Sequence, residues 1–323
     1  LTDIAGLTVG SAHDVRAGTG TSVVMCERPL RGAVDVRGGG ACTRETDVMN
    51  PAGLVETVDA IVLSGGSVYG LAAADAVTAA LGERGRGFAL LEMDGVPVSP
   101  IVPAACLYDL ANGGDKAWGR NPPYRELGFA ALADAEGGGP VRIGREGAGF
   151  GASAGVHPGA VGSASWRGKD GITVAAFAAV NCFGSVTLPG QDDVYWAWPY
   201  EVGGEFGGAR PDPSIRFELD DWGAAKLNPG ARTQTTLAVV ATDADLTRDE
   251  TRRLAVMAQD GLARAIRPVH APVDGDVVFA LSSGERPIAE PRALHLTRLG
   301  ALAADCLTRA VARGVHAART AGG

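Results

Sequence analysis

Lysine is scarce in this sequence of 323 residues: only Lys116, Lys169 and Lys226 occur, and the formal net charge is −8. A surface with such an excess of acidic groups repels phosphate backbones, which argues against nucleic-acid binding. Long apolar runs are missing too, since none reaches the roughly 18 residues that a membrane-spanning helix needs. We therefore expect no nucleic-acid partner and no membrane.

Paired cysteines are also missing from the sequence. No C-x-x-C pair occurs among its five widely spaced cysteines, Cys26, Cys42, Cys106, Cys182 and Cys306. Neither a disulfide framework nor a zinc site is indicated, and buried thiols in a reducing compartment are favoured. We expect a cytoplasmic protein without metal or cofactor. With 46% hydrophobic residues the chain can bury a large core, and we expect a single domain over 1–323.

Helical and strand-like patterns alternate along most of the chain. Apolar, β-branched runs predict strands at 21–26, 58–64, 172–188, 235–244 and 277–283, and helices are predicted at 65–85, 125–139, 246–268 and 290–315. Thr247 and Glu250 form the pattern of a capping box at the start of one helix. Many strands are apolar at nearly every position, which indicates sheets covered on both faces, as in a layered α/β or α+β sandwich.

Residues 189–233 differ from the rest, because Gly, Pro, Asp and Glu dominate and no periodicity is visible. A stretch of this length without a pattern is either functional or tail-like. It contains an aromatic cluster in which Trp196 and Trp198 are candidates for lining an apolar substrate groove or a subunit contact. A loop that caps the edge of the core explains the cluster equally well.

A glycine-rich run at 147–155, GAGFGASAG, suggests a dinucleotide-binding turn. Such a turn must open a helix, and the His157-Pro158-Gly159 sequence that follows would break one. A tight packing loop or site loop is therefore the favoured interpretation.

The segment VLSGGSVYG at 62–70 has the order strand, glycine turn, helix start. Its spacing departs from G-x-S-x-G, because Tyr69 stands where the second glycine should be, so Ser67 is favoured as a helix N-cap. The backbone N–H groups of Gly65, Gly66 and Ser67 remain candidates for contacting a substrate or an oxyanion, since helix starts attract negative charge.

His270, Asp274 and Asp276 stand close together in HAPVDGDVVF. A metal site is conceivable, but the other histidines form no metal-binding pattern, and a D-G-D turn before a strand is favoured. In an extended segment Asp274 and Asp276 point the same way. Two carboxylates aimed at one place need a cation, unless one of them holds a proton, and a free α-amino group would serve as that cation.

Thr235 begins an apolar strand directly after a polar run. A threonine hydroxyl is a poor nucleophile until a base takes its proton, and an N-terminal threonine has such a base in its own α-amino group, with a pKa near ~8. A cut between Gln234 and Thr235 would create this group. On the residues alone, a β-branched strand start remains the simpler explanation.

Several long motifs, taken in order, resemble the DmpA-type L-aminopeptidase/D-esterase family, which includes β-aminopeptidases and nylon-oligomer hydrolases. They are VDAIVLSGGSVYGLAAADAV, PIVPAACLYDL, EGAGFGASAG, VGSAS, VAAFAAVN and, towards the C-terminus, TTLAVVATDADLTRDETRRLAVMAQDGLARAIRPVHAPVDGDVVFAL. The resemblance covers nearly the whole chain except about 189–230. It implies an αββα four-layer sandwich like that of ornithine acetyltransferase, and a precursor that cuts itself before a Ser or Thr.

On this resemblance the cut falls between Gln234 and Thr235, and Thr235 is the nucleophile. The products would be an α chain, 1–234, in which 189–234 form a flexible tail, and a β chain, 235–323.

The other site residues of the family map to Asn181, Tyr108, Asp274 and Asp276. Asn181 would help to bind the developing oxyanion, and the two aspartates would hold the new amino group and tune its pKa. GGDKAWGR also matches a segment of the nylon-oligomer hydrolases, with Lys116 in register. A Thr nucleophile with D-G-D is closer to those hydrolases than to the Ser-type aminopeptidases.

Val156 departs from the family, which usually places a catalytic lysine there. Lys116, His157 and Arg145 are candidates to replace it. Gln234 also stands where Asn is common, which cleavage should tolerate because the carbonyl group is attacked.

We therefore expect a self-processing amide hydrolase that forms an acyl-enzyme at Thr235 and assembles as a homo-oligomer of processed α/β units. Its substrates would be short peptides, amino-acid amides or esters, or ω-amino-acid oligomers. An ornithine-acetyltransferase-like acyltransferase is the alternative, and an inactive relative, with Val156 marking the loss, is a third.

Overall fold

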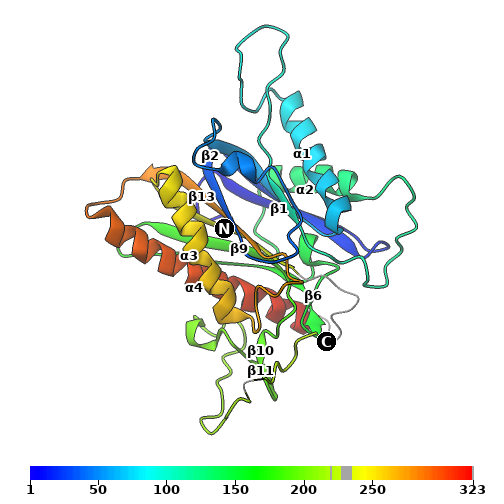
Figure 1. Cartoon of the computed structure of the whole chain (residues 1–323), viewed down its shortest axis with the longest axis vertical. Helices are drawn as coiled ribbons and strands as arrows, with labels where there is room; N and C mark the ends of the chain where they lie inside the picture. Colours follow the sequence, from blue (N-terminus) through cyan, green and yellow to red (C-terminus); the bar gives the residue numbers. More distant parts are fainter. Residues whose placement is uncertain (219, 227–234, 322–323) are drawn as a thin grey trace.

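The computed structural model describes residues 1–218, 220–226 and 235–321. Its main sheet is mixed and has the order β3-β5-β4-β2-β13-β12-β9-β8, with β1 paired to β2 outside this path (Figure 1). The strands of this sheet are β1 (Leu7–Asp14), β2 (Thr19–Val36), β3 (Thr43–Arg44), β4 (Thr57–Ser64), β5 (Ala104–Cys106), β8 (Ala160–Arg167), β9 (Thr173–Asn181), β12 (Thr235–Ala244) and β13 (Val277–Arg286).

In the part of the chain that the structure describes, four α-helices cover the strands, and two small hairpins lie apart from the main sheet. The helices are α1 (Ala72–Glu83), α2 (Tyr124–Glu136), α3 (Arg248–Ala265) and α4 (Arg292–Thr320). The hairpins are β6 (Ser153–Ala154) with β7 (His157–Pro158), and β10 (Thr187–Leu188) with β11 (Gln191–Tyr195). Within the described parts of the chain, none of the helices combines the length and apolar character needed to span a membrane.

The long strand β2 belongs to both halves of the sheet. Its residues 21–25 pair with β1 on one side and β4 on the other, whereas residues 31–36 pair with β13. The pairing with β4 shifts register between Met25 and Leu30, which is the irregularity expected where a strand bends. β1, β3, β4, β5 and the start of β2 thus form one half, and the end of β2, β13, β12, β9 and β8 form the other.

Side-chain alternation along β12 shows how the layers stack. Leu237 and Val239 point into a core shared with Ile61 and Leu63 of β4, so the two halves of the sheet pack face to face. The intervening residues of β12 point into a second core under α3 and α4, and a third core lies between the other half and α1 and α2. Three cores separate four layers, which confirms the expected αββα sandwich.

Ser67 does not cap a helix as the sequence suggested. The residues from Ser67 to Leu71 form a 3-10 turn, and α1 begins only at Ala72. Gly66 holds the N-cap position with φ +86°, and no side chain caps the turn. The left-handed backbone at Gly66 and Ser67 (φ +52°) turns the chain sharply after β4, which delays the helix.

The segment after β10 has more order than its pattern indicated. Tyr195 and Phe206 are buried and pack edge to face, with ring centroids 5.6 Å apart. Glu205 accepts hydrogen bonds from Arg309 of α4 at 2.5 and 2.9 Å. Long-range contacts of this kind leave no periodic signal in the sequence. The tail expected up to Gln234 lies in part outside the described residues.

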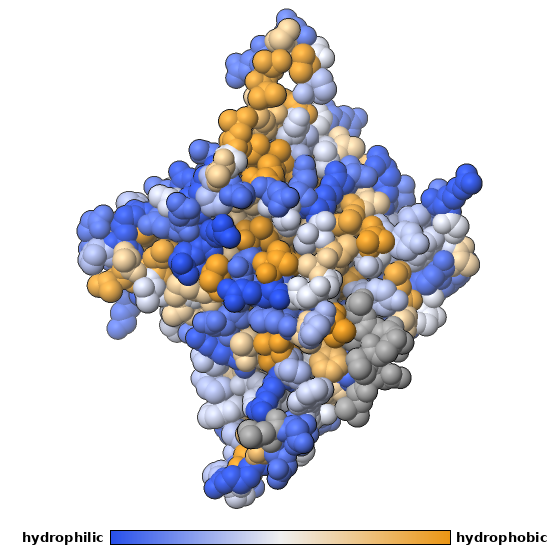
Figure 2. Space-filling view, viewed as in Figure 1, coloured by the Kyte–Doolittle hydropathy of each residue, from blue (hydrophilic) through white to orange (hydrophobic). Residues whose placement is uncertain are grey.

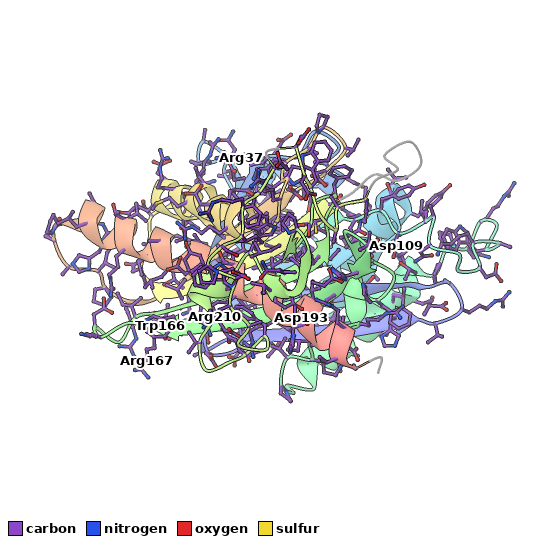
Figure 3. The ribbon with its side chains drawn as sticks, turned by 90° about the horizontal axis from the view of Figure 1, so that it is seen from below. Arg37, Asp109, Trp166, Arg167, Asp193 and Arg210 are labelled. Atoms are coloured by element: carbon purple, nitrogen blue, oxygen red, sulfur yellow. The ribbon has the colours of Figure 1, made fainter. Side chains whose placement is uncertain are left out.

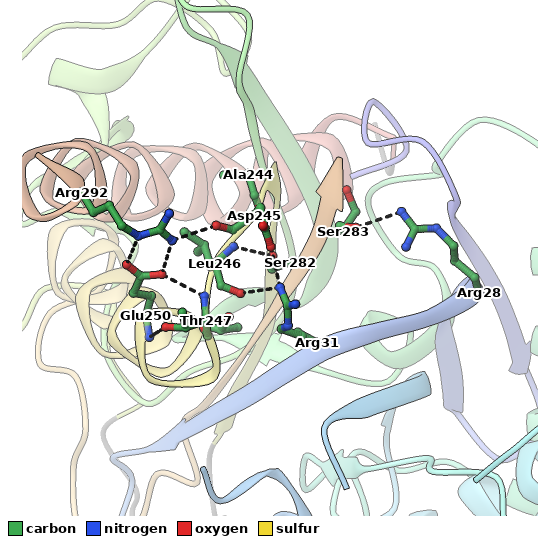
Figure 4. Close-up of polar contacts among 11 residues, drawn as sticks. Arg28, Arg31, Ala244, Asp245, Leu246, Thr247, Glu250, Ser282, Ser283 and Arg292 are labelled. Atoms are coloured by element: carbon green, nitrogen blue, oxygen red, sulfur yellow. Dashed lines mark hydrogen bonds and ion pairs between the residues drawn. The ribbon is translucent and has the colours of Figure 1, made fainter. Parts of the chain in front are cut away.

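The capping box of α3 is confirmed. The Thr247 hydroxyl accepts from the Glu250 N–H, and the Glu250 carboxylate accepts from the Thr247 N–H. Arg292, at the start of α4, donates to both oxygens of Glu250 at 2.9 and 2.6 Å (Figure 4). These contacts join α3 and α4 beside Ala244, the last residue of β12, at the end of the strand opposite to Thr235.

Candidate active site

Thr235 is the first residue of β12, and the residue is 2% exposed. Antiparallel pairing places it opposite Asn181, the last residue of β9. Parallel pairing of Leu237 with Val277 brings the D-G-D turn, which precedes β13, to the same end of the sheet. Three segments that lie far apart in the sequence therefore meet at the start of β12.

The turn Asp274-Gly275-Asp276 wraps around this strand start. Asp276 Oδ1 accepts a hydrogen bond from the Thr236 N–H at 2.7 Å. A Cβ atom added to Gly275 would lie 2.7 Å from the Thr235 hydroxyl oxygen and 2.7 Å from the Gly40 carbonyl oxygen. The position therefore needs glycine, because any side chain would collide with the hydroxyl group and with backbone.

Both carboxyl groups of the turn are buried. Burial, and next the charge of Asp276, raise the pKa of Asp274 to about 6. The N–H groups of Ala271 and Phe183 donate to Asp274 at 2.9 and 3.3 Å. Asp276 is bound by the backbone N–H of His270 at 3.1 Å and contacts its Nδ1 at 2.8 Å. Asp274 thus takes up a proton as the pH falls through about 6.

His270, Asp274 and Asp276 raised the question of a metal site. Among the described residues, no group of three or more His, Cys, Asp or Glu side chains is arranged to hold a metal ion. The three residues instead form the hydrogen-bonded turn described above.

Asn181 is held in one orientation by its neighbours. Its Oδ1 accepts from the Ser153 N–H at 3.0 Å, and its Nδ2 donates to the Tyr108 carbonyl oxygen at 3.0 Å. Tyr108 therefore touches Asn181 through its backbone. Both residues line a small cavity of about 20 Å³, together with Asp109, Ala111, Asn112, Gly151, Ser153 and Lys226.

Lys226 also lies at the candidate site, and the sequence analysis missed it. It is only 7% exposed, and its Nζ lies 3.3 Å from Asn181 Oδ1 and 3.4 Å from the Asn181 carbonyl oxygen. Its backbone N–H donates to the Phe183 carbonyl oxygen at 2.9 Å. Lys226 falls in the region that carries no motif and no periodicity, and the scarcity of lysine was the only signal that could have singled it out.

Asp109 is a second buried carboxyl group at the cavity. It accepts from the Thr19 hydroxyl at 2.6 Å and from the Gly66 N–H at 2.8 Å, and burial raises its pKa. An open groove of about 810 Å³ adjoins the cavity and shares Asn112, Gly151 and Ser153 with it. The groove provides space for a chain-like ligand next to Asn181.

The N–H groups of the glycine turn are engaged within the protein. The Gly65 N–H donates to the Gly20 carbonyl oxygen at 2.8 Å, the Gly66 N–H to Asp109 at 2.8 Å, and the Ser67 N–H to the Leu107 carbonyl oxygen at 2.9 Å. The turn thus anchors the loop of Asp109, and the three donors point to protein acceptors.

The three side chains suggested as replacements for the lysine missing at Val156 contact other groups. Lys116 Nζ donates to Asn112 Oδ1 at 2.9 Å and to the Ala17 carbonyl oxygen, so it lies beside the cavity. Arg145 donates to the Phe150 carbonyl oxygen at 3.3 Å on the rim of the groove. His157 Nε2 lies 3.3 Å from the Thr187 hydroxyl.

Trp196 and Trp198 pack away from the cavity. The Trp196 ring lies 5.3 Å from that of Phe217, and the Arg210 guanidinium lies over Trp198 at 5.8 Å. Figure 3 shows Arg210 well apart from Asp109, which lines the cavity. Neither tryptophan is among the residues that line the cavity or the adjoining groove in the described chain.

The fold and the family comparison together define the class of protein. The chain folds as a four-layer αββα sandwich with a buried hydroxyl residue at the start of a central strand. The match to a family model is specific: the chain belongs to peptidase family S58, whose model covers residues 1–323.

Relatives of known sequence agree with this assignment. An uncharacterised aminopeptidase of Mycobacterium tuberculosis is 40% identical over 340 residues, which cover 100% of this chain and 95% of the relative. A 6-aminohexanoate-oligomer endohydrolase of Paenarthrobacter ureafaciens is 28% identical over 96% of this chain and 84% of its own length.

Solved structures show the same fold. A β-aminopeptidase of Burkholderia superposes with a TM-score of 0.69 at 22% identity, over 97% of this chain and 85% of its own. The L-aminopeptidase D-Ala-esterase/amidase of Ochrobactrum anthropi, described as a variant of the Ntn-hydrolase fold, gives 0.67 at 19% identity, over 97% and 84%. The chain is an amide-bond hydrolase of family S58.

Proposed function

We propose that the chain cuts itself between Gln234 and Thr235, and that Thr235 then acts as the nucleophile of an aminopeptidase or amidase. The observation that supports this most directly is the position of Thr235. Its hydroxyl oxygen is buried at the start of β12, within contact of Gly275 and on the residue paired with Asn181. A purely structural strand start does not require an acidic turn and an amide to meet there.

The self-cleavage would proceed by an N-to-O acyl shift. Thr235 Oγ attacks the carbonyl carbon of Gln234, the peptide C–N bond breaks, and the hydroxyl proton passes to the departing nitrogen. Water then opens the ester, which leaves a carboxylate on Gln234 and a free amino group and hydroxyl group on Thr235. No step requires a cofactor.

In the processed enzyme the α-amino group of Thr235 would take the hydroxyl proton, because it sits on the same residue and has a pKa near ~8. Asp276 already binds the adjacent Thr236 N–H at 2.7 Å, so the acidic turn stands where an amino group on Thr235 would need a partner. Asn181 and Tyr108, at the cavity, are the candidates for binding the oxyanion.

The substrates we propose are short peptides, amino-acid amides or esters, and ω-amino-acid oligomers. The names of the relatives, aminopeptidase and 6-aminohexanoate-oligomer endohydrolase, support this range. The open groove beside Asn181 is large enough for several residues of an extended chain. Assaying amino-acid p-nitroanilides against 6-aminohexanoate oligomers separates the two activities.

Intact mass spectrometry tests the proposal. The purified protein should give two masses, those of 1–234 and 235–323, and Thr235→Ala should give a single uncut and inactive chain. Thr235→Ser, which keeps the hydroxyl group, should still cut. An uncut wild-type chain that hydrolyses these substrates would refute the mechanism, and transfer of the acyl group to ornithine in place of water would favour the acyltransferase.

We further propose a homo-oligomer of processed α/β units in the cytoplasm. Five free thiols support a reducing compartment. A loop between α1 and β5 projects from the body of the molecule, and Figure 2 shows apolar residues gathered on it. Leu90, Leu91 and Met93 on this loop are 72%, 59% and 61% exposed, which favours a covered surface in the assembly.

A further inference from the structure

Lys226 is the most deeply placed of the three lysines. Lys169 is exposed and Lys116 is half-buried, whereas only 7% of Lys226 is exposed. Removing an ammonium group from water is costly unless acceptors and opposite charges replace the solvent. Asn181 supplies two acceptor oxygens, at 3.3 and 3.4 Å from Nζ, and Asp274 supplies a nearby carboxyl group.

The contact with Asn181 fixes the direction of its side-chain amide. Lys226 Nζ and the Ser153 N–H both donate to Oδ1, so Oδ1 must be the carbonyl atom and Nδ2 the donor. A cation on Oδ1 also polarises the amide and makes its N–H groups stronger donors. Asn181 is the residue paired with Thr235, so the polarised amide belongs to the strand residue that lies opposite the proposed nucleophile.

Lys226 also acts on the acidic turn through its charge. Burial, and next the charge of Asp276, raise the pKa of Asp274, whereas the N–H groups of Ala271 and Phe183 and then the charge of Lys226 lower it. His270 contacts Asp276, the other carboxyl group of the turn, through its Nδ1 atom. Among the described residues, Lys226 is therefore a cationic side chain whose charge opposes the effect of burial on the pKa of Asp274.

We propose that Lys226 is the positioning cation of this active site, holding Asn181 and keeping Asp274 ionised during self-cleavage and substrate hydrolysis. The proposal rests on the function proposed above. The Val156 N–H donates to the Ala224 carbonyl oxygen at 2.9 Å, two residues before Lys226. The segment that carries Lys226 thus runs alongside the position where the sequence lacks a lysine.

The test compares Lys226→Met, Lys226→Arg and the surface control Lys169→Met. Each precursor is purified unfolded and refolded across the pH range around 6, and the rate of self-cleavage is followed by gel. The uncut chain has no free amino group on Thr235, so that group does not contribute to the acid limb of its pH–rate profile. The comparison of Lys226→Met with wild type then isolates the part of this limb that depends on Lys226. Lys226→Met should slow cleavage by roughly tenfold or more and move the acid limb of the pH–rate profile to higher pH. Lys226→Arg should leave the position of the acid limb unchanged. Lys169→Met should match wild type in both rate and acid limb.

Each failure has a distinct signature. A wild-type chain that never cuts refutes the proposed function. A wild type that cuts while Lys226→Met matches it in rate and acid limb refutes the role of Lys226 alone. A uniform loss of rate in both Lys226 variants with an unmoved limb means a structural role and overturns the inference. If Lys226→Met does not fold, Lys226→Arg decides: an unmoved limb at near wild-type rate supports the proposal, and a shifted limb overturns it.

Discussion

The space around Thr235, at the start of β12, is limited by a single residue, Gly275. A Cβ atom at Gly275 would lie 2.7 Å from the Thr235 hydroxyl oxygen and 2.7 Å from the Gly40 carbonyl oxygen. Gly40 itself has ordinary room, since a Cβ there would meet its nearest atoms at 3.5 Å. Gly275 therefore has no room for a side chain, whereas Gly40 has room for a methyl group.

Gly275→Ala is expected to stop or strongly slow self-cleavage, because the methyl group displaces the Thr235 hydroxyl. It should also destabilise the fold by about 1–3 kcal/mol, the usual cost of overpacking. Gly40→Ala is the matched control and should cleave normally. Gel analysis of freshly expressed protein measures both, and normal cleavage of Gly275→Ala would contradict the close contact.

Because its pKa is raised, Asp274 should make the stability of the folded protein depend on pH. The folded state binds this proton more tightly than the unfolded state, whose pKa is 3.8, so stability falls as the pH rises from 3.8 through about 6. In the uncut Thr235→Ala background, Asp274→Asn should raise the melting temperature at neutral pH and change it little near pH 4. A gain on the order of 1–3 kcal/mol is expected. Equal melting curves at neutral pH would show that Asp274 ionises without penalty.

At the scale of elements, an ion pair between Glu250 and Arg292 joins the starts of α3 and α4. The hydrogen bonds of Arg292, and then those of Thr247, lower the pKa of Glu250 to about 2. A lowered carboxyl pKa contributes stability that is complete above the unfolded value of 4.5 and is lost as the pH falls towards 2. The junction of α3 and α4 therefore depends on the ionised form of Glu250.

Glu250→Gln keeps the shape of the capping box but removes the charge that Arg292 contacts. Its melting temperature should lie below that of wild type at neutral pH, and the difference should shrink as the pH falls below 4.5. Glu285→Gln, at a longer contact of 3.5 Å with Arg28, serves as control and should change little. A difference for Glu250→Gln that is constant with pH would assign the loss to packing.

The sequence predicted the periodic elements well and the long-range contacts poorly. β12, the capping box of α3 and the course of α4 follow from apolar runs and cap residues. The two roles of β2 were missed, since pairing with β4 and with β13 leaves the same apolar pattern. The approach of Asn181 to Thr235 was expected from family resemblance alone, because strand pairing is set by distant segments.

The burial of Lys226 could not be predicted from the sequence. Its neighbours in sequence, rich in glycine, proline and acidic residues, have no period that would place it in a layer. Its burial depends on the Phe183 carbonyl and the Asn181 oxygens, which stand over 40 residues earlier in the chain. Such contacts become visible only when the fold is known.

At the scale of the whole molecule, the apolar loop between α1 and β5 is the clearest unpaired surface in the described chain (Figure 2). Leu90→Ser combined with Met93→Ser should lower the mass of the assembly measured by sedimentation velocity, because apolar area at the contact is lost. Leu294→Ser, at an exposed residue of α4, is the control. An unchanged mass in the double variant would place the subunit contact elsewhere.

The central place of β12 bears on how the enzyme is made. Its partners are β9, from the segment before the proposed cut, and β13, from the segment after it. Folding of the precursor is unimolecular, whereas a processed enzyme that has been denatured must bring two separate chains together again. Refolding should then depend on protein concentration for the processed enzyme but not for the uncut Thr235→Ala chain. The covalent link in the uncut chain thus helps the two segments of the mature enzyme to fold together.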